Sequence, residues 1–307
     1  MANEIAEAGE TSVTRARIHV LRDGRLHLQD GPIDLIVEAH GAPGEVRTAY
    51  QAAQSRFVTI LDELCAELAL LRSPVSAKSA RPNGLIAARM FAAVQAYSRR
   101  RFITPMAAVA GAVAESVLAA MTNATTLDRA YVNNGGDIAL YLASGHKFTI
   151  GMVDRPDQPS LFGSLEIPAD LPVRGIATSG WRGRSFSLGI ADAVTVLAAK
   201  AADADAAATI LGNAVDLPGH AAITRAPANE IAPDSDLVDF LVTRDVGSLK
   251  PSEIEQALDA GAILAEELQA SGLIYAAALH LQGITRVVSA HTLTAALDFP
   301  QRSLLHA

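Results

Sequence analysis

Cysteine, aromatic side chains and long apolar runs are all scarce in this chain of 307 residues. The single cysteine, Cys65, excludes a disulfide bond within the chain. Its position among leucines at helical spacing predicts that the thiol is buried in the core. Aromatic residues account for 5% of the chain and hydrophobic residues for 50%, so alanine, valine, leucine and isoleucine must form the core.

A membrane-spanning segment and a basic surface are also missing from the pattern. No stretch approaches the roughly 18 consecutive apolar residues of a transmembrane helix. Residues 1–14 lack the basic and apolar regions of a signal peptide. The net charge of −8 argues against a broad nucleic-acid surface. We therefore expect a cytoplasmic protein that binds neither membranes nor nucleic acids and has a disordered segment at 1–14.

The periodicity of the first half predicts helices and antiparallel hairpins. Residues 15–40 alternate between apolar and polar around Asp23-Gly24, a pair typical of type I′ hairpin turns. Helical spacing follows at 44–71, at 85–97 and after Thr104-Pro105, where threonine suits an N-cap and proline suits the first helical turn. The small residues of this third helix indicate either tight packing on a sheet or an N-terminus that faces a ligand.

The second half of the chain continues this mixture. Strands are expected within 130–153, and a loop rich in proline and aspartate at 154–164. Two strands joined by a loop then precede a helix at 202–213, short irregular strands at 215–248, a helix from a capping box at Ser252 to about Gly272, and a closing hairpin. The order predicts one α+β domain over 15–307, with antiparallel sheets packed with helices, and not a doubly wound parallel sheet.

Three short segments contain candidate functional residues. In the turn 133–137, Gly135 and Gly136 permit positive φ angles and a close approach to the backbone. Amide groups in such a turn can bind an anion. Asp137 can bind a ribose hydroxyl or a metal ion. A hairpin turn without a ligand, in which Asp137 accepts turn hydrogen bonds, explains the same residues.

The second segment, GIATSG at 175–180, offers the hydroxyl groups of Thr178 and Ser179 and the bare backbone of Gly180 for phosphate or carbonyl recognition. It also fits an ordinary turn at the end of a strand. Arg182 and Arg184 follow directly, and guanidinium groups bind phosphate or carboxylate through two hydrogen bonds. The plain alternative is a pair of solvated loop arginines.

The third segment places Asp205 and Thr209 four residues apart on a predicted helix, so both oxygen groups lie on one face. A carboxylate and a hydroxyl in this arrangement can bind Mg²⁺, which prefers oxygen ligands. A surface aspartate beside a threonine bonded to its own helix is the alternative. Asp192 and Asp203 are other acids that could take the same role.

Taken in order, the three segments resemble the ApbE family of FAD:protein flavin transferases. That family has an NxGGD turn, an ATSG segment and a helix with ADAxxTA, which correspond here to 133–137, 177–180 and 204–209. The segments ITPMAAVAGAVAE and GRSFSLGIADAVTVLA are similar to the UPF0280 branch of ApbE-like proteins. The resemblance implies an ApbE-type fold related to the T-fold and a Mg²⁺ ion at Asp205 and Thr209. It also implies that the pyrophosphate and flavin lie near Gly135, Gly136 and the Thr178–Gly180 loop. The candidate cofactor-binding residues are therefore Asn134, Gly135, Gly136, Asp137, Thr178, Ser179, Gly180, Arg182 and Arg184.

The chain departs from this family at two places. The family has a histidine after its ATSG segment, where this chain has Ser185 or Ser187, and a serine hydroxyl cannot replace imidazole as a general base. The family lysine in the preceding helix is absent, and Glu115 lies near its place. A carboxylate there repels phosphates unless a cation intervenes. The catalytic residue is therefore unassigned, with Ser185, Ser187 and Glu115 as candidates.

Two functions remain open at this point. In the first, an ApbE-like protein binds an anionic, nucleotide- or cofactor-like molecule with Mg²⁺ and transfers flavin from FAD to an acceptor protein. In the second, the fold is retained in a ligand-binding or assembly protein without catalysis. A homodimer is expected in both cases. The eight histidines are scattered without the spacing of zinc ligands, so no zinc site is assigned.

Overall fold

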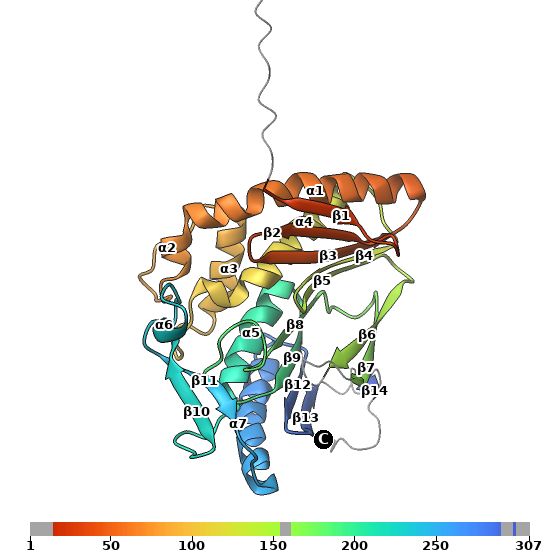
Figure 1. Cartoon of the computed structure of the whole chain (residues 1–307). Helices are drawn as coiled ribbons and strands as arrows, with labels where there is room; N and C mark the ends of the chain where they lie inside the picture. Colours follow the sequence, from red (N-terminus) through yellow and green to blue (C-terminus); the bar gives the residue numbers. More distant parts are fainter. Residues whose placement is uncertain (1–14, 154–160, 290–296, 299–307) are drawn as a thin grey trace, which may run out of the picture.

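The computed structural model describes residues 15–153, 161–289 and 297–298, so the predicted disorder at 1–14 lies outside the described residues. The described chain is organised around a nine-stranded sheet in which every neighbouring pair is antiparallel (Figure 1). In spatial order the strands are β1 (Arg17–Val20), β2 (Leu26–Asp30), β3 (Ile33–His40), β4 (Arg129–Asn134), β5 (Asp137–Leu142), β8 (Gly175–Ser179), β9 (Ala193–Ala198), β12 (Ala276–Leu281) and β13 (Ile284–Ser289). Together with the helices, this sheet confirms the predicted α+β class.

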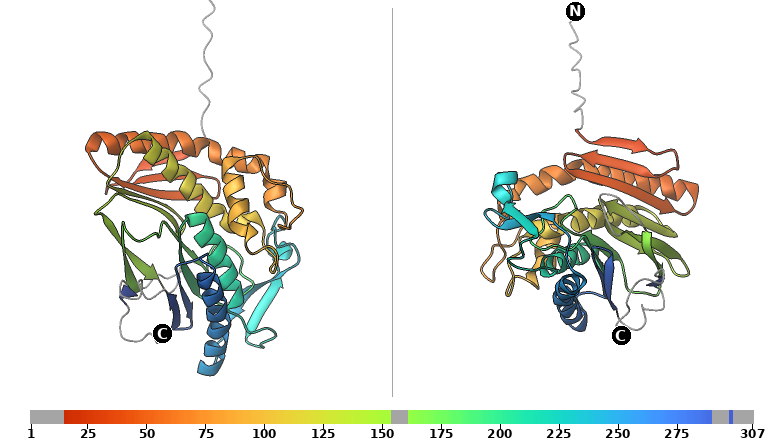
Figure 2. Two further views of the ribbon diagram at one scale, coloured as in Figure 1. Left: turned by 180° about the vertical axis from the view of Figure 1, so that it is seen from behind. Right: turned by 60° about the horizontal axis from the view of Figure 1, so that its bottom comes forward.

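Helices cover one face of the large sheet, as the view from behind shows (Figure 2). The longer ones are α1 (Pro43–Ala66), α3 (Leu85–Gln95), α4 (Val109–Ala124), α5 (Ala201–Ala214) and α7 (Pro251–Ala270). Short helices are α2 (Leu68–Leu71), α6 (Ala228–Ile231) and a 3₁₀ turn, η1 (Pro105–Ala108). The main hydrophobic core lies between these helices and the sheet.

A small sheet lies against the opposite face. It consists of β14 (Leu297–Asp298), β7 (Leu161–Pro168) and β6 (Lys147–Val153), in that order. A second apolar cluster, which includes Leu140, Leu165 and Ile176, joins it to the large sheet. A separate pair, β10 (Ile223–Pro227) and β11 (Leu241–Val246), accounts for the short strands expected at 215–248.

The large sheet changes character along its width. In β2 and β3, fully buried residues alternate with half-buried ones, as expected for strands with one covered face. All residues of β9 and β12 are buried. Both faces of the sheet are therefore covered around β9 and β12, where helices pack on one side.

Helices α4 and α5 approach each other closely at Gly111. A Cβ atom at this position would lie 2.3 Å from the carbonyl oxygen of Ala201, so only glycine fits the contact. The small residues of α4 thus provide tight packing, as one interpretation predicted, although the close partner is a helix and not the sheet.

Several local predictions are corrected by the structure. The Asp23-Gly24 turn is not of type I′, because Gly24 has a positive φ of +86° and Asp23 does not. The Gly24 amide donates to the carbonyl of Leu21 instead, and the strands are joined by the longer loop 21–25. Cys65 is exposed and not in the core, because Leu64 occupies the buried side of α1 at that turn.

Three helix or strand boundaries also differ from the predicted ones. The Thr104 hydroxyl donates to Asp236 and does not cap its helix, which starts with the 3₁₀ turn η1. Helix α7 has its N-cap at Lys250, whose amide donates to the Glu253 carboxylate over 2.8 Å, so the capping arrangement lies two residues before Ser252. Strand β7 starts inside the expected loop 154–164 because its backbone pairs with β6.

One helical stretch of the described residues, Pro105–Ala124, is long and apolar enough to cross a membrane by length and composition alone. In the protein, 56% of its most apolar window is buried, and α4 packs against α1, α5, β4 and β5. A core helix meets the same criterion, so this stretch is weak evidence for a membrane span.

Candidate functional site

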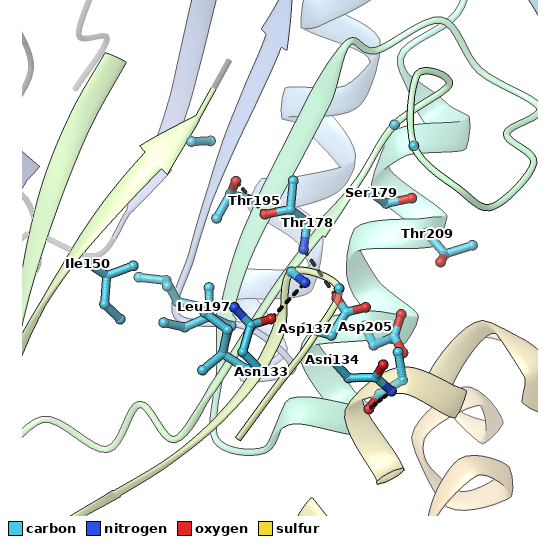
Figure 3. Close-up of a pocket in the computed structure, with 18 of the residues that line it drawn as sticks. Asn133, Asn134, Asp137, Ile150, Thr178, Ser179, Thr195, Leu197, Asp205 and Thr209 are labelled. Carbon is cyan, nitrogen blue, oxygen red and sulfur yellow. Dashed lines mark hydrogen bonds between the residues drawn. The ribbon is translucent and has the colours of Figure 1, made fainter. Parts of the chain in front are cut away.

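The three predicted segments converge on one cavity of about 600 Å³ (Figure 3). Every residue predicted to bind a cofactor or a metal ion lines it: Asn134, Gly135, Gly136, Asp137, Thr178, Ser179, Gly180, Arg182, Arg184, Asp205 and Thr209. These residues come from the β4–β5 turn, the end of β8 with the following loop, and α5. The expected juxtaposition of distant segments is therefore present in the structure.

The turn between β4 and β5 is both a tight hairpin and a wall of the cavity. Asn134 pairs with Asp137, and only Gly135 and Gly136 lie between them, with φ angles of +67° and +113°. The Gly136 amide donates to the side-chain oxygen of Asn133 over 2.8 Å. That amide is occupied, so the predicted anion-binding nest lacks one of its donors.

The carboxyl groups of Asp137 and Asp205 point toward one another in the cavity (Figure 3). Asp137 accepts a hydrogen bond of 3.3 Å from the Thr178 amide. Asp205 accepts one of 3.0 Å from the Gly111 amide, at the start of α4. Thr209 lies one turn beyond Asp205 on the same face of α5, as the spacing predicted.

Burial perturbs both acids. It raises the pKa of Asp205 to about 7, against the opposing effect of hydrogen bonds from the Gly111 and Ala110 amides. Burial also raises the pKa of Asp137 well above its ordinary value, and the nearby charge of Asp205 adds to this effect. The Thr178 hydrogen bond and the charge of Arg184 lower the pKa of Asp137 again, by less. Two carboxylates in this setting repel one another and favour a bound proton or a cation.

The N-terminus of helix α4 forms hydrogen bonds with two cavity residues, Asp205 and Asn134. Its first turn donates to Asp205, and the Asn134 side-chain amide donates to the carbonyl oxygen of Ala110 over 3.2 Å. The N-terminus of α4 therefore faces the cavity, where the second interpretation of this helix expects a ligand. The end of β8 is tied to β9 through the hydroxyl groups of Thr178 and Thr195, 3.0 Å apart. Gly180 is required for packing, because a Cβ there would lie 2.4 Å from the Asp192 carbonyl oxygen.

The two arginines differ in their contacts. Arg182 donates from Nε to Asp192 over 2.8 Å, and its guanidinium lies 4.2 Å from the centre of the Trp181 ring. Arg184 is exposed and makes no side-chain hydrogen bond or ion pair within the described part of the chain. Its Nη2 atom occupies the place of a Cβ atom on Gly135, at 2.0 Å from it. Gly135 is therefore required for this contact as well as for the turn.

The candidate catalytic residues are separated by the structure. Ser185 is exposed and lines the cavity. Ser187 is buried away from it, where its hydroxyl donates to Asn213 over 3.3 Å and accepts from the Gly189 amide. Glu115 lines a second hollow together with Asp203, and its carboxylate accepts a hydrogen bond of 2.9 Å from the Ala202 amide, at the start of α5. Glu115 thus caps a helix and does not face the predicted phosphate site.

The other half of the cavity is apolar. Ile150 and Leu165 come from the small sheet, and Ile176 and Leu197 come from the large one. Sequence reasoning missed this half, because single aliphatic residues in strands look like ordinary core. It also missed Thr195 as a cavity residue and Asp192 as a hydrogen-bond acceptor of Arg182, because no local pattern in the sequence indicates either.

The glycine turn, the Thr178–Gly180 loop and the Asp205–Thr209 pair, which carried the ApbE-like resemblance, lie around one cavity between antiparallel sheets and helices. A protein-family model described as "AbpE bacteria" matches residues 18–287. The chain belongs to this family.

The curated relatives are UPF0280 proteins, as the resemblance predicted. That of Methanothrix thermoacetophila is 43% identical over 114 residues, which are 37% of this chain and 46% of the relative. That of Archaeoglobus fulgidus is 35% identical over 144 residues, 47% of this chain and 58% of the relative. The matches span about half the length of these relatives. The solved structure of the flavin transferase ApbE from Vibrio cholerae aligns with 89% of this chain and 98% of its own at a TM-score of 0.46 and 13% identity. That likeness is too distant to support an argument about the site.

Proposed function

We propose that the protein binds a phosphate-bearing, nucleotide-like cofactor with Mg²⁺ in this cavity and transfers part of it to an acceptor protein. FAD is the proposed donor and a serine or threonine hydroxyl is the proposed acceptor. The observation that supports the proposal is the convergence of Asp137, Asp205 and Thr209 with Arg182 and Arg184 in one cavity of about 600 Å³. A volume of this order is typical of cofactor pockets, which measure roughly 300–1,000 Å³.

The donor set fits a magnesium ion. Asp137, Asp205 and Thr209 present oxygen atoms to the cavity. Burial raises the pKa of both carboxyl groups, so a cation that replaces the lost solvation of their charges would be favoured. Among the described residues, no three His, Cys, Asp or Glu side chains gather as an all-protein metal site. The ion would therefore complete its shell with phosphate oxygens and water, as Mg²⁺ commonly does. When bound, it supplies positive charge that stabilises the phosphate leaving group.

The protein's own residues have distinct proposed roles. Arg182 and Arg184 bind phosphate oxygens from the loop side, and the hydroxyls of Thr178 and Ser179 donate hydrogen bonds to the same groups. The aliphatic half of the cavity buries the ring system of the cofactor and excludes water. Asp137 uses one oxygen for the Thr178 amide. Its other oxygen would face the magnesium ion, so no residue of the chain is assigned as the base that takes the proton of the acceptor hydroxyl.

The proposed reaction cleaves the phosphoanhydride bond of FAD and forms a phosphoester between FMN and the acceptor hydroxyl, releasing AMP. We would incubate the purified chain with FAD, MgCl₂ and candidate acceptor proteins, and measure AMP and the acceptor mass. AMP release with one added FMN per acceptor is expected for the wild type. Both should be lost in D205N and T209V. The matched control is D216N, because Asp216 pairs with Arg225 and does not line the cavity. Wild-type activity in D205N would contradict the proposal.

The alternative is a cofactor-binding protein without catalysis. One observation favours it: among the described residues that line the cavity there is no histidine, lysine, tyrosine or cysteine. In that case FAD binds in the presence of Mg²⁺, yet no AMP appears with any acceptor. The same incubation therefore separates the two functions.

A further inference from the structure

Asp192 joins three segments that frame the cavity without lining it. Asp192 lies just before β9 and is buried, with only 4% of the residue exposed. One oxygen accepts hydrogen bonds from Trp181 Nε1, at 3.2 Å, and Arg182 Nε, at 2.8 Å. The other accepts from the Gln282 amide, at 2.7 Å, in the turn between β12 and β13. A buried carboxylate with three donors is fully satisfied and fixed in place.

The geometry at Arg182 leaves part of its guanidinium available. Only Nε bonds to Asp192, and within the described residues the two terminal amino groups make no hydrogen bond. The Trp181 ring covers one face of the group. Arg182 lines the cavity, and Asp192 and Trp181 do not. Asp192 therefore holds the Arg182 side chain at Nε, and the two terminal amino groups are available to bind a ligand in the cavity that Arg182 lines.

Gln282 extends this support to a further loop. Its side chain accepts from the Leu249 amide at 3.1 Å and donates to the Gly247 carbonyl at 2.8 Å. Arg184, two residues from Arg182, has no comparable partner in the described part of the chain. One arginine of the pair is thus fixed before a ligand arrives, and fixing a long side chain in advance reduces the entropy lost on binding.

We propose that Asp192 is a positioning residue that holds Arg182 so that its two terminal amino groups bind a phosphate or diphosphate group of the ligand. From the proposed function, this inference takes only that the ligand is an anion; it does not require flavin transfer. Asp192 acts through Arg182 and does not touch the ligand itself. Removing its charge has opposite effects under the two views of its role. If Asp192 acted only as a nearby negative charge, it would repel the anion, and D192N would bind the anion more tightly. If Asp192 positions Arg182, D192N should bind the anion more weakly.

The test uses inorganic pyrophosphate and the full chain, with and without MgCl₂, by isothermal titration calorimetry. The dissociation constant of D192N is expected to be about tenfold higher than that of the wild type, since one charge-assisted hydrogen bond loses its geometry. R182Q should weaken binding by a similar factor. The double variant D192N/R182Q should bind like R182Q alone, because Asp192 has no route to the anion except through Arg182.

The only tryptophan of the chain, Trp181, gives a spectroscopic readout of the same contact. Pyrophosphate should change its emission in the wild type, and the change should be small in R182Q. The control D216N removes a carboxylate from another half-buried arginine pair, whose side chains are 16% and 20% exposed. It should leave the pyrophosphate affinity unchanged even if it lowers the melting temperature.

Unchanged or tighter binding by folded D192N would overturn the inference, and so would additive effects in the double variant. If D192N does not fold, R182K is the variant to measure. Lysine keeps the positive charge but cannot donate to Asp192 and to the anion at the same time from one planar group. Wild-type pyrophosphate affinity in R182K would therefore also overturn the inference. Absence of pyrophosphate binding by the wild type has the same meaning. If pyrophosphate binding depends on both residues but no flavin is transferred from FAD, the proposed transferase function is wrong and the inference about Asp192 still holds.

Discussion

The carboxyl groups of Asp137 and Asp205 meet in the cavity from a strand and a helix that are distant in the sequence, and the charge of Asp205 raises the pKa of Asp137. Burial has the larger effect on both groups. This pair should make the stability of the folded chain depend on protons and cations at one place.

The pair should make stability depend on pH. Both pKa values are higher in the folded chain than in the unfolded one, where aspartate titrates at about 3.9. Between about pH 4 and 7 the folded state therefore binds more protons, and the free energy of unfolding falls as the pH rises. Thermal unfolding of the wild type and D137N over this range tests the idea. D137N should show a shallower decline; equal slopes would contradict it.

Magnesium should reverse part of this loss. A divalent ion between the two carboxylates binds the folded state and raises the melting temperature. The increase should be larger at pH 8 than at pH 5, since protons compete for the same oxygens. D205N and T209V should show little increase, whereas D216N should respond as the wild type does. An equal response in D205N would show that the ion binds elsewhere.

Gly135→Ala should disturb both the turn and Arg184. Its φ of +67° strains any side chain, at roughly 1–2 kcal/mol, and its Cβ would collide with the Arg184 guanidinium. We expect lower stability and weaker pyrophosphate binding. Gly24→Ala is the matched control, because Gly24 also has a positive φ, of +86°, but no atom lies within 4 Å of the added Cβ. It should lower stability and leave binding intact; a binding defect in G24A would count against the Arg184 contact.

Gly111→Ala should separate α4 from α5. The added Cβ would meet the backbone of Ala201, which cannot rotate away, so a loss of about 1–3 kcal/mol or more is expected in denaturant unfolding. The Mg²⁺ response should also weaken, since the Gly111 amide holds Asp205. Gly44→Ala in the first turn of α1 has only the end of Arg47 nearby, at 3.8 Å, and should be neutral or slightly stabilising. Wild-type stability in G111A would contradict the close packing.

Glu115→Gln should affect stability and not ligand binding. The carboxylate caps the start of α5 through the Ala202 amide, so its charge interacts favourably with that helix end. A loss of about 0.5–1 kcal/mol is expected, with unchanged affinity for pyrophosphate by calorimetry. A large loss of affinity would return Glu115 to the functional site.

Much of the architecture was predictable from periodicity. The hairpins at 15–40 and in the closing region and the helices α1, α3, α5 and α7 follow patterns of period 2 and 3.6 that depend on one covered face. The exceptions have local physical reasons. Cys65 looked like core because leucines surround it in the sequence, yet it lies on the outer side of α1. Thr104 and Ser252 are good caps by residue type, but Thr104 bonds to the distant Asp236, and Pro251 begins the helix one residue earlier.

The candidate site divides in the same way. Glycine pairs, hydroxyls and the Asp205–Thr209 spacing are local features, so they were found. The hydrogen bonds of Asp192 to Trp181, Arg182 and Gln282 join residues that only the strand order of the sheet brings together. The chemical roles assigned to the cavity residues, the homodimer, the cytoplasmic location and the extent of the domain stay predictions.

The position of β12 next to β9 has a consequence for biosynthesis. Ala276 and Ala278 of β12 line the cavity, and the turn after it supplies the Gln282 amide to Asp192. A growing chain on the ribosome reaches these residues long after the glycine corner has emerged. Pairing such distant strands is slow compared with forming helices. A nascent chain should therefore be unable to retain the proposed ligand until the final hairpin has been translated, so the ligand would bind only after synthesis.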